Sequence, residues 1–463
     1  MVTNLSIFIL LLLAVSALGE ARRDSANKAI IINARLFHYE VVTFFLHHLN
    51  AIGLQSEVWL TNYTKLDPMM GSTGPAFLQH YEQNFKYFQD PRFEKNFTQF
   101  EDFDDKPFKL LVYINSDENT DINWMCDLGV HDRLMENADR VLMVVHHAGN
   151  ANLLVPVCKP PRCALFVLGQ HIEDAAIRYL SLRQSHTKVL SAYGIFDLPS
   201  KFINEARSLK QQVIQNAAKS KSKTPRHVVI QGSLRFTRRR YKELFQCVED
   251  ISKGGTPIKL TLIGGSTDED KIIVPKTIEP FTSIEADKTF DEFYPIVSSA
   301  DFVVTFANEG FSYLENRSTS SVTISIVCDV PLAVPHSMLS KYNCLKEQTV
   351  HKFIARRTDC ASLQAAMKLS DRDIFRMKQE VKYCKDSWRE RARAMLKHFA
   401  FTPYNESTAV YEKQCVPGKD VVADPILEQI KRDREQHRQK VVVPFGLTKQ
   451  AAITPTKAVV KGK

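Results

Sequence analysis

Short, continuous runs of apolar residues alternate along the chain with longer segments that carry apolar residues at helical spacing. The first run, at 29–33, is followed by an amphipathic stretch at 39–52 that ends at a glycine, and then by a second run at 57–60. Strands that are buried on both faces of a parallel sheet have this continuous hydrophobicity. Similar runs follow at 109–114, 140–145 and 163–168. The pattern predicts a parallel sheet covered by helices.

A second series of the same kind follows a polar, proline-terminated segment at 219–226, which we interpret as a linker. Its predicted strands lie at 227–230, 258–263, 301–306 and 331–334, and its predicted helices at 241–251, 290–299, 319–327 and 371–399. Alternation of strand and helix at this spacing is typical of βαβ units. The fold class is therefore α/β, with two tandem Rossmann-like domains that face a central cleft. Their predicted bounds are 28–218 and 227–400, followed by a mostly disordered tail at 401–463.

The N-terminus predicts entry into the secretory pathway. Residues 5–19 form an uncharged apolar run of fifteen that ends in small residues, which resembles a signal peptide at 1–19 more than a transmembrane span. Because Arg22 and Arg23 follow the run instead of preceding it, a short uncleaved anchor remains the alternative. Either reading places the chain in the ER or Golgi lumen or outside the cell.

Charge is concentrated at the other end. The 463 residues include 61 Lys and Arg and 52 Asp and Glu, a net charge of +9, and residues 431–463 alone carry +7. The rest of the chain is nearly neutral, which argues against a nucleic-acid-binding core. The basic tail is either simply solvated or makes weak contact with membranes or polyanions.

Sequons and cysteines agree with the secretory route. Four sequons occur, and we expect glycans on one or more of Asn62, Asn96 and Asn405 but none on Asn316, which lies in a predicted binding loop. Nine cysteines leave at least one thiol unpaired, and Cys158 and Cys163 are the best local disulfide candidates. No cysteine or histidine cluster has zinc spacing, so no metal site is predicted.

The first chemical cluster, at 231–241 (QGSLRFTRRRY), joins a predicted strand to a predicted helix. Gly232 allows close backbone approach, and four arginines crowd the turn. A helix N-terminus favours anions and guanidinium groups pair with phosphate oxygens, so the cluster predicts phosphate binding. A basic surface patch is the alternative.

The second cluster, at 308–321 (NEGFSYLENRSTSS), also follows a predicted strand. It brings Arg317 and four consecutive hydroxyl side chains to the start of an apolar helix, where free backbone N–H groups and hydroxyls can bind a diphosphate. A simple helix cap would account for one hydroxyl, not four.

These motifs resemble the nucleotide-sugar-binding half of GT-B glycosyltransferases. The similarity spans 227–339 and rests on GSLRFTRRRY, LTLIGG, FDEFYPIVSSADFVVTF and SYLENRSTSS leading into SIVCDVPLAVP. In that family the arginine turn and the hydroxyl-rich helix start hold the donor diphosphate. The resemblance therefore implies donor-binding roles for Gly232, Arg235, Arg239, Tyr313, Arg317, Ser320 and Ser321.

The sequence departs from the family at one position. Many retaining members have two glutamates seven residues apart, and Glu309 is the candidate for the first. Aligned on Pro331, the second falls near Ile324, and Asp329 replaces the usual glycine. The ribose contact and the choice between retaining and inverting chemistry are left open.

The first domain offers two candidate catalytic histidines. His38 directly precedes the first predicted helix and His146 ends a predicted strand, both on the cleft side. A histidine there can deprotonate an acceptor hydroxyl. For each, a hydrogen-bonded structural role is the alternative.

Together these features predict a hexosyl- or pentosyltransferase that uses a nucleotide-sugar donor, a glycan, protein or lipid acceptor and no metal or other cofactor. A nucleotide-sugar epimerase of the same fold and a non-catalytic secreted glycan-binding protein are the alternatives.

Overall fold

The protein is described from a computed structural model. The described residues are 27–33, 38–61, 77–81, 85–88, 106–116, 122, 125–126, 129–220, 223–265, 272–308, 315–339, 341–342 and 353–403. They belong to one compact unit, residues 1–415. The predictions that fall outside them are the signal peptide at 1–19, Glu309, Tyr313, the sequons Asn62, Asn96 and Asn405, and most of the tail at 401–463. No helix in the described part is long and apolar enough to cross a membrane.

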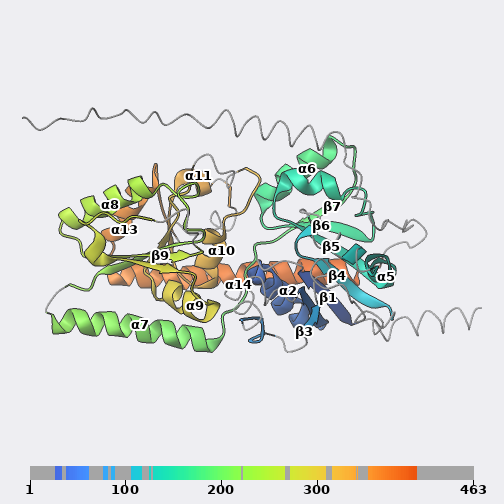
Figure 1. Cartoon of the computed structure of the whole chain (residues 1–463), viewed down its shortest axis with the longest axis horizontal. Coiled ribbons are helices and arrows are strands. Elements are labelled where there is room, and N and C mark those ends of the chain that lie inside the picture. The colour runs from blue at the N-terminus through green and yellow to red at the C-terminus, as the bar shows by residue number, and fades with distance from the viewer. Residues whose placement is uncertain are drawn as a thin grey trace, which may run out of the picture. The chain divides into compact units, whose positions relative to one another are not determined.

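The first half of this unit is built on a parallel sheet in the strand order β3-β2-β1-β4-β5-β6-β7 (Figure 1). Its strands are β1 (Lys28–Asn33), β2 (Gln55–Thr61), β3 (Phe85–Phe88), β4 (Phe108–Tyr113), β5 (Ala138–Val145), β6 (Cys163–Val167) and β7 (Lys188–Ser191). Every residue of β6 is buried, as the continuous apolar runs predict. The strand order reverses between β1 and β4, where ligands bind in doubly wound sheets.

The second half repeats this arrangement in the order β10-β9-β8-β11-β12-β13, again all parallel. Its strands are β8 (Arg226–Gln231), β9 (Ile258–Gly264), β10 (Thr282–Ala286), β11 (Phe302–Val304), β12 (Leu332–Pro335) and β13 (Phe353–Arg356). Here the order reverses between β8 and β11. Both chemical clusters of the sequence follow these two strands, so they meet at the switch point.

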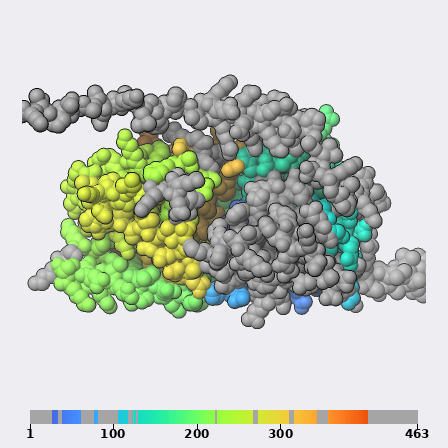
Figure 2. Space-filling model, in the orientation of Figure 1, coloured from blue at the N-terminus to red at the C-terminus, as the bar shows by residue number. Residues whose placement is uncertain are grey.

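Helices accompany both sheets. They are α2 (Tyr39–Ala51), α5 (His131–Asn137), η2 (Ala148–Leu154), α6 (Gln170–Ser181), α7 (Ser200–Lys219), α8 (Tyr241–Lys253), α9 (Phe290–Ser299), α10 (Ser320–Val327), α11 (His336–Leu339), α13 (Asp359–Met367) and α14 (Asp371–Phe401), together with the short turn η4 (Glu279–Phe281). Side chains of α7, α8 and α9 form a continuous green-to-yellow surface of the second half (Figure 2).

Two helices do not follow the domain bounds expected from the sequence. Helix α7, whose residues fall almost entirely within the predicted first domain, packs on α9 of the second half, and its Lys210 forms a 2.7 Å ion pair with Asp301. Helix α14 begins in the second half beside α10 and ends in the first half against α2 and β5 (Figure 1). The chain therefore crosses to the second half between β7 and α7 and returns along α14, whereas the predicted linker at 219–226 joins α7 to β8 within the second half.

Two disulfides lie within the described residues. Cys158 and Cys163 form the one expected from the sequence, and Cys247 and Cys360 form the other, which joins α8 to α13. Cys328 and Cys384 are buried and are not disulfide-bonded.

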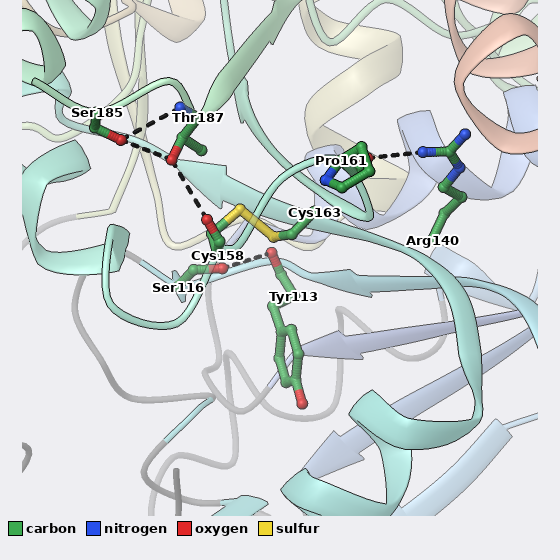
Figure 3. The surroundings of a disulfide bond; sticks show 8 residues. All are labelled: Tyr113, Ser116, Arg140, Cys158, Pro161, Cys163, Ser185 and Thr187. Atoms are coloured by element: carbon green, nitrogen blue, oxygen red, sulfur yellow. Dashed lines mark hydrogen bonds between the residues drawn. A yellow bond between two sulfur atoms is a disulfide. The ribbon is translucent and has the colours of Figure 1, made fainter. Parts of the chain in front are cut away.

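Arg140 connects the small disulfide loop to the end of the last helix. Its Nη1 donates to the carbonyl of Pro161 over 2.7 Å (Figure 3), and its Nη2 donates to the carbonyl of Thr402. The guanidinium group also lies over the ring of Phe399, 5.3 Å from its centroid. Arg140 is only 6% exposed, so these contacts hold the end of α14 on the first half.

Candidate functional site

The arginine turn begins at Gly232, directly after β8. Its φ of +112° favours glycine, and a Cβ there would lie 2.9 Å from Nη2 of Arg239. Gly264 ends the neighbouring strand with a φ of +150°, and a Cβ there would lie 1.8 Å from the carbonyl oxygen of Gly232. The two glycines thus let the ends of β8 and β9 and the Arg239 guanidinium approach one another closely.

The arginines of this turn have different roles. Arg235 is exposed, whereas Arg239 is 4% exposed and donates from Nη2 to the carbonyl of Gln231 over 2.6 Å. Arg240 forms a 2.5 Å ion pair with the buried carboxylate of Asp359. Arg235 is therefore the one of these three placed to meet a ligand from solvent, and Arg240 holds α13 against the turn.

The hydroxyl-rich segment forms the start of α10. Thr319 is its N-cap and accepts a hydrogen bond from the N–H of Ser321 over 3.3 Å. The Nε2 of Gln231 donates to the hydroxyls of Ser320 and Ser321 over 3.2 and 3.1 Å. Arg239 reaches the Ser321 hydroxyl over 3.4 Å. The end of β8, the arginine turn and the start of α10 therefore form one polar cluster.

Gln231 was not among the predicted site residues. It is 3% exposed and is the last residue of β8. A polar residue that ends an otherwise apolar strand was the signal that could have identified it.

Arg317 lies against the first half. Its backbone forms an antiparallel bridge with His147, and its carbonyl accepts from Nε2 of His171 over 3.0 Å. The neighbouring carbonyl of Asn316 accepts from the N–H of Ala148 over 2.9 Å. This loop therefore brings the predicted diphosphate site next to the strand ends of the first sheet.

The two candidate catalytic histidines are in direct contact. The rings of His38 and His146 stack with their centroids 3.7 Å apart, and a ring nitrogen of His146 lies 2.8 Å from the carbonyl of Ile114. His38 is the N-cap of α2 with a φ of +65°, and its Nδ1 lies 3.5 Å from the Glu40 carboxylate. A positive φ at a residue other than glycine is uncommon and is often found at functional sites.

The charge state of this cluster follows from its surroundings. Burial lowers the pKa of His146 well below its ordinary value, and the charges of His38 and Arg317 add to this effect, while the Ile114 carbonyl opposes it. Burial raises the pKa of Glu40, but the hydrogen bond and charge of His38 outweigh it, so the net pKa is lowered. His146 is therefore a neutral imidazole and Glu40 a carboxylate near neutral pH.

Two asparagines at the switch point of the first sheet were missed from the sequence. Asn115, just after β4, donates from Nδ2 to Oδ1 of Asn33 at the end of β1 over 2.6 Å. They are 2% and 0% exposed. The sequence feature that could have identified them is the same as for Gln231: a polar residue at the end of a buried, apolar strand.

The departure from the family pattern has a structural counterpart. Ile324, at the position of the second glutamate, is 5% exposed and packs in the apolar core. Asp329 has a φ of +56°, a conformation that suits the glycine usual at this position and that aspartate tolerates. Among the described residues no group of three histidine, cysteine or acidic side chains is placed to hold a metal ion.

Of the predicted site residues, the structure brings Gly232, Arg239, Ser320 and Ser321 together in one cluster. It places Arg317, His38 and His146 in a second cluster, beside the first sheet. Arg235 lies exposed on the turn.

No protein-family model matches this sequence, and no curated protein matches it. Solved structures with the same architecture include the N-terminal domain of trehalose-6-phosphate phosphatase from Candida albicans, with a TM-score of 0.51 and 9% identity over 81% of this chain and 97% of that one. A glycosyltransferase from Rickettsia africae ESF-5 has a TM-score of 0.50 and 7% identity over 82% and 100% of the two chains. An α,α-trehalose-phosphate synthase (UDP-forming) from Burkholderia vietnamiensis has a TM-score of 0.50 and 9% identity over 81% and 99%. These likenesses confirm the GT-B fold predicted from the sequence.

Proposed function

We propose that the protein is a glycosyltransferase that moves a sugar from a nucleotide-sugar donor to a hydroxyl of a glycan, protein or lipid acceptor. The observation that carries this proposal is the polar cluster of Gln231, Gly232, Arg239, Ser320 and Ser321 at the switch point of the second sheet. Ligands of doubly wound sheets bind at such points, and the start of a helix favours phosphate. Two structures with the same fold are named as a glycosyltransferase and as a UDP-forming synthase, which agrees with the proposed transfer from a nucleotide-sugar donor.

The donor diphosphate is assigned to the space between the arginine turn and the start of α10. A side chain at position 232 would point toward Arg239 and Ser320, so the glycine keeps this space clear, and the first N–H groups and hydroxyls of α10 donate to the phosphate oxygens. Arg235 and Arg317 supply the guanidinium groups. Fixed donors of this kind stabilise the negative charge that develops on the departing diphosphate, which is a major electrostatic contribution to such transfers.

The acceptor hydroxyl is assigned to the histidine pair. His38 is the better base of the two, because the Glu40 carboxylate beside it stabilises the imidazolium that forms when it takes a proton. His146, with its lowered pKa, stacks on His38 and orients it. A base that activates the acceptor directly implies inversion at the anomeric carbon.

We assign the protein to the lumen of the ER or Golgi or to the extracellular space. The disulfides of the described part support an oxidising compartment.

Donor binding can be tested by a thermal-shift screen of nucleoside diphosphates, followed by calorimetry with the best one. Arg235→Ala and Arg317→Ala should each weaken binding about ten- to a hundredfold, the loss of one charge-assisted contact. Lys242→Ala is the matched control, since it removes an exposed positive charge from the first turn of α8. Unchanged affinity in both arginine variants would remove the donor assignment.

The base can be tested by turnover with a saturating donor. His38→Ala should lower turnover about a hundredfold or more while donor affinity is kept, and the exposed His186→Ala should have no effect. A larger loss in His146→Ala than in His38→Ala would transfer the role of base to His146.

A further inference from the structure

A groove with a volume of about 580 Å³ runs between α6 and the loop that contains Arg317. Its polar lining consists of Gln170, Asp174, Arg178, Glu315, Asn316 and Lys341. The volume falls within the range of pockets that enclose small organic ligands. None of these residues belongs to the donor or histidine clusters described above.

The groove is elongated along the helix. Its lining includes Gln170, Asp174, Arg178 and Leu182, which recur every four residues and therefore lie along one face of α6. At 1.5 Å per residue, these positions span about 18 Å. An extended ligand therefore fits this site better than a compact one.

The charged side chains that line the groove carry no net charge. Asp174 and Glu315 supply two negative charges, and Arg178 and Lys341 supply two positive ones. In the part of the chain that the structure describes, Arg178, Glu315 and Lys341 enter no ion pair, and Asp174 only accepts a 3.4 Å hydrogen bond from Gln170. An evenly balanced lining gives no net attraction for a phosphorylated or sulfated ligand.

The chemistry of the lining favours hydroxyl groups. Carboxylates, amides, a guanidinium and an ammonium group offer both hydrogen-bond donors and acceptors, which is what a chain of sugar hydroxyls requires. Tyr179 and the exposed Leu182 add apolar surface against which the faces of sugar rings can pack. A lipid tail would leave this polar lining without hydrogen bonds, at a high cost in free energy.

One end of the groove adjoins the proposed donor site. His171, which lines this end, contacts the Arg317 carbonyl, and its ring centroid lies 4.6 Å from that of Tyr342. The Tyr342 hydroxyl in turn accepts from the N–H of Thr319, the N-cap of α10, over 2.9 Å. The groove is therefore linked to the start of α10 through His171 and Tyr342.

From this geometry we propose that the groove along α6 binds an uncharged oligosaccharide, which is the acceptor of the transfer reaction. Its role as acceptor rests on the function proposed above. The binding itself does not, because the groove and the donor site have no lining residue in common.

The experiment measures, by calorimetry on the full-length protein, the binding of neutral glucose-, mannose- and N-acetylglucosamine-based oligosaccharides of increasing length. Affinity should rise with chain length and then level off once the groove is filled. Asp174→Ala and Lys341→Ala, one from each wall, should each weaken binding at least tenfold and leave nucleoside diphosphate affinity unchanged. The control is Ile177→Ala, an exposed residue of α6 that does not line the groove.

The proposal is overturned if no neutral oligosaccharide binds, if both groove variants bind as wild type does, or if a sugar phosphate or an acidic peptide binds there more tightly. The variants are all at exposed positions, and circular dichroism verifies that they fold. Oligosaccharide binding without any nucleoside diphosphate binding would count against the proposed function and leave the groove assignment in place.

Discussion

Replacement of Arg240 should destabilise the protein, although Arg240 lies in the same turn as a residue assigned to the donor. Asp359, its partner, is 1% exposed and also accepts hydrogen bonds from the Thr305 hydroxyl over 2.7 Å and from the Phe306 N–H over 3.1 Å. Removing one partner of a fully buried ion pair costs about 3–5 kcal/mol. The Arg240 side chain is 27% exposed and Asp359 keeps two other donors, so we expect Arg240→Ala to cost about 2–3 kcal/mol.

The size of this loss should depend on pH. Burial already raises the pKa of the Asp359 carboxyl above its usual value, and the Arg240 charge opposes that rise. Without Arg240 the pKa rises further. Below about pH 3.9, the usual pKa of an aspartate in an unfolded chain, Asp359 is protonated in the folded and the unfolded state alike, and the full stability is present. As pH rises through the higher pKa of the folded state, the buried carboxyl loses its proton and this stability is lost. The difference between wild type and Arg240→Ala should therefore be small near pH 4 and grow toward neutral pH.

Urea unfolding followed by far-ultraviolet circular dichroism at several pH values measures this difference. Arg235→Ala is the matched control, because that side chain is exposed and its loss should change the free energy of unfolding by less than about 0.5 kcal/mol. A loss in Arg240→Ala that is equal near pH 4 and near pH 7 would show that the buried charge of Asp359 is not its cause. Equal stability of the two variants would refute the division of roles within the turn.

Three further predictions concern the backbone, the glycans and the last helix. Gly264→Ala places a Cβ on the carbonyl of Gly232 and forces a φ that alanine avoids, so it should cost about 1–3 kcal/mol or more in urea unfolding and also weaken nucleotide binding; a neutral effect would contradict the close approach of β8 and β9. Asn316, whose side-chain oxygen is buried, should carry no glycan in peptide mass mapping of protein expressed through a secretory host, and substantial occupancy in protein that still binds nucleotide would place its loop outside the site. Arg140→Ala removes two partly buried hydrogen bonds from a charged group to backbone carbonyls, one of them that of Thr402, and should lower the free energy of unfolding by about 2–4 kcal/mol, whereas wild-type stability would show that α14 does not depend on this anchor.

The main strands were predictable from the sequence because burial on both faces leaves a continuous apolar run. The predicted run at 163–168 became β6 at Cys163–Val167, and the predicted helix at 290–299 became α9 at Phe290–Ser299. Strands β7 and β10 were missed, because each is partly exposed and lacks such a run.

Long-range contacts were not predictable from local pattern. The packing of α7 on α9 depends on an aromatic and ionic surface that sequence order does not reveal. The different roles of the arginines in the turn are a similar case, because Arg240 is distinguished by Asp359, a residue 119 positions further along the chain. The site residues at strand ends were only partly predictable, since arginine and hydroxyl clusters form recognisable motifs and a single amide such as Gln231 does not.

The course of α14 has a consequence for how the protein is made. Its first turn is fixed by a capping box in the second half, and its last turns share an apolar cluster with α2 of the first half through Leu396 and Phe399. Synthesis proceeds from the N-terminus, so the sheet of the first half leaves the ribosome long before the helix that covers α2. Until residue 401 has emerged, that face of α2 has no covering and is available to chaperones or to other nascent chains. The first half is therefore completed only after the second half has been synthesised, although its strands are the first to be made.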